Sequence, residues 1–236
     1  MRSFFLVSVL FIFLAGSGCM NRVEKASENM IAPIRFLALG DSYTIGEGVE
    51  THAAWPEVLR DTLQQLGVSL PAPQIVAKTG WTTDELLAAI VKENLEPPYD
   101  FVSLLIGVNN QYRGTSRGYQ LDDYNEDFSI LLNKAIELAN GNPGRVLVIS
   151  IPDYSVTPFV SVESKARVAH EIDTYNQVKK LLSDSAGVLY VDITPISQMA
   201  ANNQSLLASD NLHPSEMMYK KWVAEMLPLV LNRLNQ

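Results

Sequence analysis

The stretch IRFLALGDSYTIGEGV at residues 34–49 begins as a short apolar run that stops at Gly40 and is followed at once by an acid and a serine. Apolar runs of this length that end in Gly, Asp and Ser are typical of β-strands that run into a turn. Two interpretations of the turn are open. It ends a strand and does nothing more, or it presents Ser42 as a nucleophile. The rest of the chain decides between them.

Short apolar runs and longer helical stretches alternate after this point. Four further runs rich in Val, Ile and Leu follow, QIVAK at 74–78, FVSLLI at 101–106, RVLVIS at 145–150 and VLYVDI at 188–193. Apolar residues recur with helical spacing in five stretches, at 55–66, 83–94, 121–139, 162–182 and 215–234. Strands that alternate with helices predict a mainly parallel sheet covered on both faces. We therefore expect a three-layer α/β/α sandwich with a five-stranded sheet, in one domain over residues 34–236.

Composition narrows the class of protein. The chain has 236 residues, of which 47% are hydrophobic, and a formal net charge of −8. These values suit a globular domain with a sizeable core. An acidic chain lacks the basic surface that nucleic-acid binding requires, so no nucleic-acid partner is expected. The three histidines are scattered along the sequence, so neither a metal nor another cofactor is expected.

Residues 1–18 predict an export signal. An apolar run at residues 4–15 is shorter than the about 20 residues that span a bilayer and is typical of a secretory signal peptide. Cys19 follows three small residues and resembles the lipid-modified cysteine of bacterial lipoproteins, although Gly16 stands where their lipobox usually has Leu. We expect a lipid anchor on Cys19, a tether at 19–33 and attachment to a membrane of the bacterial cell envelope. The alternative is an ordinary signal peptide with a bystander cysteine, and a periplasmic or secreted protein.

Polar, glycine-bearing turns follow the first three predicted strands. They bring Ser42, Gly80 and Asn109 in that order, and Asp210 and His213 come just before the last predicted helix. In an open parallel sheet, ligands bind outside the carboxyl ends of the strands. These side chains are therefore expected to gather at one edge of the sheet.

The gathered residue types are those that acyl transfer needs. A serine hydroxyl needs a base to take its proton, and a carboxylate on the other imidazole nitrogen fixes the tautomer of that base. Ser42 and His213 are the candidate nucleophile and base, and a turn can bring the carboxylate of Asp210 to the imidazole. The oxyanion needs fixed donors, and the backbone N–H groups of Ser42 and Gly80 with the amide of Asn109 are candidates.

Four motifs occur in the order of the sequence blocks of one known superfamily: GDSY at 40–43, Gly80, GVNN at 107–110 and DNLHP at 210–214. On these residues the chain resembles the SGNH hydrolases, also called GDSL-type esterases and lipases. The resemblance implies a flavodoxin-like α/β/α fold and metal-free hydrolysis of esters. It implies a nucleophile, two oxyanion donors and the last two triad members at Ser42, Gly80, Asn109, Asp210 and His213.

The third block departs from the superfamily pattern at its fourth residue, which is usually Asp and is here Asn110. The uncharged amide either ties down its own loop or alters the charge of the site. The glycine-containing segment 111–120 is expected to be a loop at the rim of the cleft. Asn110, Tyr112 and Arg113 are candidate substrate-binding residues, because a guanidinium binds anionic groups and an aromatic ring packs on an acyl chain or a sugar. The alternative is a solvated loop that does not contact the substrate.

The leading hypothesis is a serine esterase of the carboxylesterase or lysophospholipase kind, acting on a small-molecule, lipid or glycan ester. The rival is a catalytically silent envelope lipoprotein that binds a ligand with the same fold. A silent protein would not need Ser42, Asn109 and His213 together. Asp41 is interpreted as a turn acid rather than the triad acid.

Overall fold

A computed structural model describes residues 33–234, apart from the side chains of Thr115 and Arg117. The predicted signal peptide at 1–18 and the tether up to residue 32, with the predicted anchor at Cys19, lie outside the described residues. No helix between residues 33 and 234 combines the length and hydrophobicity that crossing a bilayer would require.

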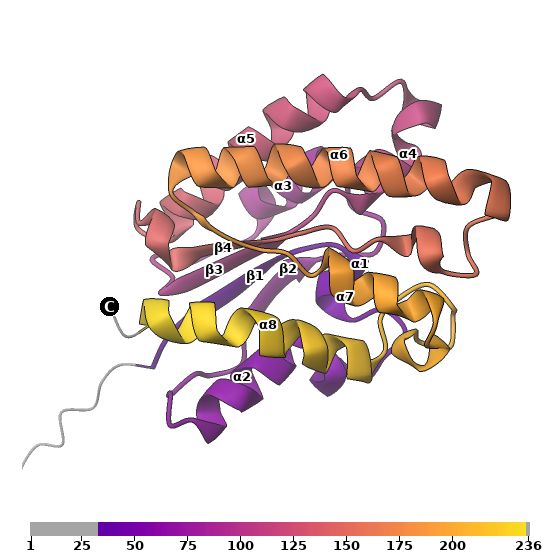
Figure 1. The fold of residues 1–236 in the computed structure, drawn as a ribbon. Helices are drawn as coiled ribbons and strands as arrows, with labels where there is room; N and C mark the ends of the chain where they lie inside the picture. Colours follow the sequence, from indigo (N-terminus) through magenta and orange to yellow (C-terminus); the bar gives the residue numbers. More distant parts are fainter. Residues whose placement is uncertain (1–32, 235–236) are drawn as a thin grey trace, which may run out of the picture. The chain divides into compact units, whose positions relative to one another are not determined.

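The five predicted strands are confirmed. They form one sheet of five parallel strands in the order β2-β1-β3-β4-β5 (Figure 1). Their bounds are β1 Phe36–Gly40, β2 Gln74–Ala77, β3 Phe101–Leu105, β4 Val146–Ile149 and β5 Leu189–Val191. Every residue of β1, β3 and β4 is buried, which explains why these strands read as continuous apolar runs.

Helices cover both faces of the sheet. The long ones are α2 Trp55–Gln65, α3 Thr83–Lys92, α5 Leu121–Leu138, α6 Val162–Ala186 and α8 Glu216–Leu234. Figure 1 shows α2 and α8 together on one face, and α3, α5 and α6 on the other. The predicted three-layer α/β/α sandwich is therefore confirmed. Shorter helices are α1 Ser42–Ile45, α4 Val108–Arg117, α7 Thr194–Gln198 and the 3₁₀ turns Thr51–Ala53, Pro143–Arg145, Tyr154–Val156, Met199–Ala201 and Gln204–Leu206.

The order of the strands determines where a ligand can bind. From β1 the chain crosses through α2 to the edge strand β2, and it then returns through α3 to β3, on the other side of β1. The two crossovers lie on opposite faces, so the helices part above the carboxyl ends of β1 and β3. Such a reversal point is the usual ligand site of this strand order.

One expectation about the rim was wrong. The segment at 111–120 is mostly helical, because α4 runs through it to Arg117. Gly107 precedes the helix, and Gly118 ends it in the left-handed region, where its N–H bonds the carbonyl oxygen of Gly114. The glycines and hydroxyl residues give this segment a poor helix propensity. Tertiary contacts outweigh that propensity, since the side chain of Asn110 bonds Thr83 of α3.

A buried lysine ties α6 to the carboxyl edge of the sheet. Lys179 is fully buried, and its Nζ donates to the carbonyl oxygens of Ile106 at 3.1 Å and Ile149 at 2.5 Å, just beyond β3 and at the end of β4. Burial lowers the pKa of Lys179 to about 7, against an opposing effect of the nearby Asp41 carboxylate. Above about pH 7 the folded protein therefore holds mostly the neutral amine, which still donates both hydrogen bonds.

Replacing Lys179 by Met is expected to lower the free energy of unfolding by about 2 kcal/mol, because two buried carbonyl groups lose their donor. Between pH 7 and 10 the unfolded lysine binds more protons than the buried one, so the stability of the wild type rises with pH in this range. The difference between Lys179→Met and wild type should thus widen from pH 7 to pH 10, as measured by urea unfolding. Lys180→Met is the matched control, because Lys180 is exposed, pairs with Asp184 on its own helix and lies over the ring of Tyr190, at 5.8 Å. Equal effects of the two substitutions would contradict the buried role of Lys179.

Candidate active site

Ser42 begins the helix that follows β1. Asp41 precedes α1 and caps it, its carboxylate accepting the backbone N–H of Tyr43 at 3.0 Å. The turn needs Gly40, since a Cβ there would lie 2.1 Å from the Thr44 hydroxyl and 2.4 Å from the carbonyl oxygen of Leu105. At Gly40, just before Ser42, the backbone of β1 therefore lies too close to that of β3 for any side chain. Asp41 is a structural cap, as predicted, and its burial raises its pKa to about 7, against the N–H of Tyr43 and the charge of Lys179.

A closed loop before α8 carries the candidate acid and base. Leu207 and Pro214 pair as an antiparallel bridge, and the N–H of Ala208 donates to the carbonyl oxygen of His213 at 2.8 Å. Inside the loop, Oδ1 of Asp210 accepts the backbone N–H groups of Leu212 at 2.9 Å and His213 at 3.0 Å. One carboxylate oxygen therefore holds the loop, and the other remains free to face the imidazole.

Ser42, His213 and Asp210 form a continuous hydrogen-bonded chain. His213 Nε2 lies 3.0 Å from Ser42 Oγ, and His213 Nδ1 lies 2.6 Å from Asp210 Oδ2. A carboxylate on Nδ1 favours the tautomer with the proton there, which leaves Nε2 as the acceptor for the serine proton. Partial burial would raise the pKa of Asp210, but the hydrogen bonds from the His213 ring and from the two backbone N–H groups outweigh it and lower the pKa. Asp210 therefore stays ionised at neutral pH.

The imidazole is also supported by packing. The ring of Tyr43 lies 5.3 Å from that of His213, centroid to centroid, and Tyr43 is itself buried against Trp222. The Tyr219 hydroxyl donates to the backbone carbonyl of Tyr43 at 3.1 Å. Sequence reasoning did not assign Tyr43 this contact, although its place beside the nucleophile was a usable signal.

Gly80 and Asn109 border the same cleft as Ser42 and His213. Gly80 has φ +84°, a backbone conformation that side-chain-bearing residues rarely adopt, so the turn requires glycine. A Cβ at this position would also lie 2.3 Å from a guanidinium nitrogen of Arg113, which would have to move. The side-chain nitrogen of Asn109 donates one hydrogen to the carbonyl oxygen of Trp81 at 3.0 Å. An amide nitrogen carries two hydrogens, and this bond fixes the plane of the group while the second hydrogen remains for a ligand.

The cleft has a volume of about 240 Å³. Two of the predicted substrate-binding residues, Tyr112 and Arg113, line it. It is completed by aromatic and apolar side chains, chiefly Tyr43, Val108, Tyr154, Phe159 and Leu212. Tyr154 and Phe159 both come from the segment at 151–159 that follows β4. Among the described residues, no three His, Cys, Asp or Glu side chains lie close enough together to hold a metal ion.

Asn110 is placed differently from the expectation that it binds substrate. It is 1% exposed and is not among the residues that line the cleft. Its Oδ1 accepts the backbone N–H of Thr83 at 3.1 Å, and its Nδ2 donates to the Thr83 hydroxyl at 2.7 Å. Of the two roles considered for this residue, the structure gives it the one that ties down its own segment.

Comparison with known proteins identifies the family and the fold. The sequence matches the GDSL-like Lipase/Acylhydrolase family over residues 38–221. Similar solved structures include Axe2, an acetylxylan esterase from Geobacillus stearothermophilus, with 20% identity and a TM-score of 0.64 over 84% of this chain and 94% of that chain. The acetyl xylan esterase AlAXEase has 18% identity and a TM-score of 0.67 over 84% and 100%, and TesA has 16% and 0.65 over 84% and 99%. At these identities the structural likenesses show the shared fold. No curated protein matched the sequence significantly.

Replacing Asn110 by Ala should lower the free energy of unfolding by about 1–3 kcal/mol, because the buried N–H of Thr83 loses its acceptor. Denaturant unfolding measures this change, with Asn94→Ala, at an exposed position, as the control. An unchanged unfolding midpoint together with a raised KM would instead assign Asn110 to substrate binding.

Proposed function

The chain belongs to the GDSL-like Lipase/Acylhydrolase family of ester-hydrolysing enzymes, and from this premise we propose that it is a serine esterase with Ser42 as its nucleophile. The observation that carries the proposal is the hydrogen-bonded chain from Ser42 Oγ through His213 to Asp210, with distances of 3.0 and 2.6 Å. Its nucleophile and base open onto a cleft that Gly80 and Asn109 also line.

In the acylation step, Ser42 Oγ attacks the ester carbonyl carbon while its proton passes to His213 Nε2. The carbonyl electron pair moves onto oxygen, and the resulting imidazolium is stabilised by the Asp210 carboxylate. The oxyanion accepts hydrogen bonds from the backbone N–H groups of Ser42 and Gly80 and from the Asn109 amide. Collapse of the intermediate breaks the bond to the alcohol oxygen, which receives the proton held by His213.

Deacylation repeats these movements with water. His213 takes a proton from the water as it attacks the acyl carbon, and returns that proton to Ser42 Oγ when the acid leaves. Asp210 keeps its charge through both steps, because the loop N–H groups and the imidazole stabilise its ionised form. The substrate of this chemistry is a carboxylic ester of a small molecule, a lipid or a glycan.

Ser42→Ala should reduce hydrolysis of p-nitrophenyl acetate by at least about 10³-fold, because no acyl-enzyme can form without Oγ. The folding control is circular dichroism of the variant beside the wild type. Ester turnover by the wild type also distinguishes the esterase from the rival hypothesis, a catalytically silent protein that binds a ligand. A wild-type protein that turns over no ester in a p-nitrophenyl series from acetate to palmitate would be a silent binder.

Asn109→Ala should lower kcat by roughly 10²–10³-fold with little change in KM, because the second amide hydrogen serves an oxygen that becomes charged only in the transition state. Steady-state kinetics on p-nitrophenyl acetate test this. A raised KM at constant kcat would mean that the amide binds the ground state instead.

We further propose that the enzyme is exported and held to a membrane of the cell envelope through lipid on Cys19. The proposal rests on the apolar run at 4–15 and the cysteine that follows it. Mass spectrometry of the mature N-terminus should find a lipid-modified Cys19, and Cys19→Ser should remove esterase activity from the membrane fraction. An unmodified N-terminus at another residue, with wild-type activity in the soluble fraction, would contradict the anchor and leave the esterase proposal standing.

A further inference from the structure

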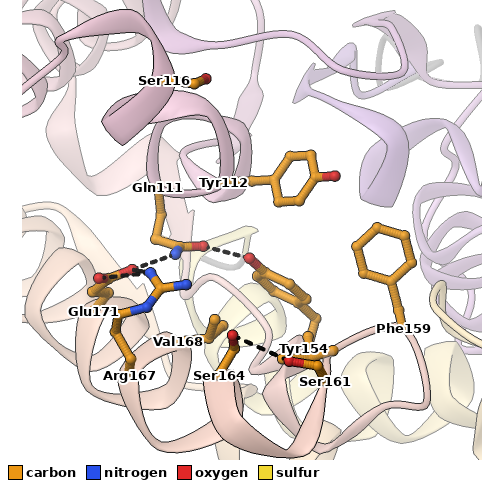
Figure 2. Close-up of a pocket in the computed structure, with 11 residues that line it drawn as sticks. Gln111, Tyr112, Ser116, Tyr154, Phe159, Ser161, Ser164, Arg167, Val168 and Glu171 are labelled. Carbon is orange, nitrogen blue, oxygen red and sulfur yellow. Dashed lines mark hydrogen bonds and ion pairs between the residues drawn. The ribbon is translucent and has the colours of Figure 1, made fainter.

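A second and larger cavity lies beside the active-site cleft. Its volume is about 650 Å³, against about 240 Å³ for the cleft that holds Ser42. The two share three aromatic side chains, Tyr112, Tyr154 and Phe159, which Figure 2 shows around the larger cavity. A molecule bound at Ser42 that extends past these rings therefore enters the larger cavity.

A hydrogen-bonded polar network lines one side of this cavity. The Tyr154 hydroxyl donates to Gln111 Oε1 at 2.7 Å, and Gln111 Nε2 donates to Glu171 Oε2 at 2.6 Å. Arg167 Nη1 then donates to both carboxylate oxygens of Glu171 at 3.0 Å (Figure 2). Burial raises the pKa of Tyr154 to about 12, so this hydroxyl stays protonated and the direction of its bond is fixed. The network holds a charged acceptor beside a charged donor at one side of the cavity.

The walls combine ring faces with hydroxyl groups. Tyr112 is 57% exposed and Phe159 49%, which is high for aromatic residues that contact one another. Three serines, Ser116, Ser161 and Ser164, also line the cavity (Figure 2), together with Val160 and Val168. Ser161 Oγ donates to Ser164 Oγ at 3.2 Å, and Ser116 Oγ donates to the carbonyl oxygen of Arg113 at 2.8 Å. An exposed ring presents an apolar face to a flat molecule, and hydroxyl groups offer both donors and acceptors.

We infer that this cavity binds the alcohol part of the ester, and that this part is a neutral ring rich in hydroxyl groups, such as a sugar. The inference rests on the proposed esterase function. Hydroxyl groups can donate to Glu171 and accept from Arg167 at the same time, and the ring can lie on Tyr112 or Phe159. The smaller cleft, lined by Val108 and Leu212, takes the acyl group.

Other ligand chemistries fit the cavity less well. An acyl chain would remove water from the Arg167–Glu171 pair without replacing its hydrogen bonds, which is unfavourable. An anionic group would meet the Glu171 carboxylate, and a cation would meet Arg167. A neutral polyhydroxyl group satisfies both charges.

Two esters with the same acyl group test the inference. 6-O-Acetylglucose and cyclohexylmethyl acetate both join acetate through a CH₂ to a six-membered ring, and only the first ring carries hydroxyl groups. We expect the wild type to have the higher kcat/KM for the glucose ester. Arg167→Met keeps the side-chain stem and removes the guanidinium, and Ser164→Phe fills the cavity. Arg167→Met should lower the ratio of the two kcat/KM values by about tenfold or more, the loss expected when a site's hydrogen bonds to a hydroxyl-rich ligand are removed. Ser164→Phe should lower kcat/KM for both esters, because a filled cavity admits neither ring.

Matched controls on the same helix lie outside the cavity. Lys180→Met and Ser185→Phe make the same kinds of change at exposed positions and should leave both kcat/KM values, and hence their ratio, unchanged. A wild type that hydrolyses both esters equally, or prefers the cyclohexyl ester, overturns the inference and leaves the esterase proposal intact.

A binding measurement tests the sugar-binding cavity independently of the proposed esterase activity. Saturation-transfer NMR of methyl β-glucoside with Ser42→Ala protein should show binding that Ser164→Phe abolishes in the double variant. Binding without any ester turnover by the wild type would support the subsite and contradict the esterase. Absence of binding together with absence of sugar-ester preference would contradict the subsite.

Discussion

The parallel pairing of β1 with β3 is the constraint on which the site depends. Gly40 pairs with Leu105 at the carboxyl ends of the two strands, so the chain leaves both strands side by side. Ser42 follows one end and Asn109 follows the other. Both strands are wholly buried, so a slip of one residue would exchange the side chains that pack in the two helical layers. The sheet thereby fixes the spacing between the proposed nucleophile, Ser42, and the proposed oxyanion donor, Asn109.

The two acids near Ser42, Asp41 and Asp210, have opposite pKa shifts because their surroundings differ. Asp41 adjoins Ser42 in the sequence, but its carboxylate caps α1 and burial raises its pKa. Asp210 lies far away in the sequence, yet three hydrogen bonds hold its pKa low and its Oδ2 faces the imidazole. The ionised acid is the one suited to stabilise an imidazolium. Lys179, the buried amine near Asp41, serves the fold by bonding the strand ends rather than the chemistry.

Much of the fold could be predicted from the sequence. Strands buried on both faces appear as short apolar runs, and polar, glycine-bearing turns mark where most of these runs end. The grouping of Ser42, Gly80, Asn109 and His213 followed from their places after strands and before the last helix. The helix α4 could not be predicted, since its glycines and hydroxyl residues indicate a loop and only contacts such as Asn110 with Thr83 stabilise it. The same contact places Asn110 away from the residues that line the cleft, where the sequence pattern had suggested substrate binding. Lys179 lies in a helical stretch of charged residues, and sequence alone does not distinguish a buried lysine from the exposed Lys180 beside it.

The account depends most on Ser42 as the attacking atom. The most direct measurement is peptide mass mapping of wild-type protein after reaction with a fluorophosphonate, which forms a stable adduct with an activated serine. The account predicts one phosphonyl group per chain, on the peptide that contains Ser42, and loss of esterase activity in proportion to labelling. A phosphonyl group on a different residue, or full ester turnover by protein labelled at Ser42, would contradict it.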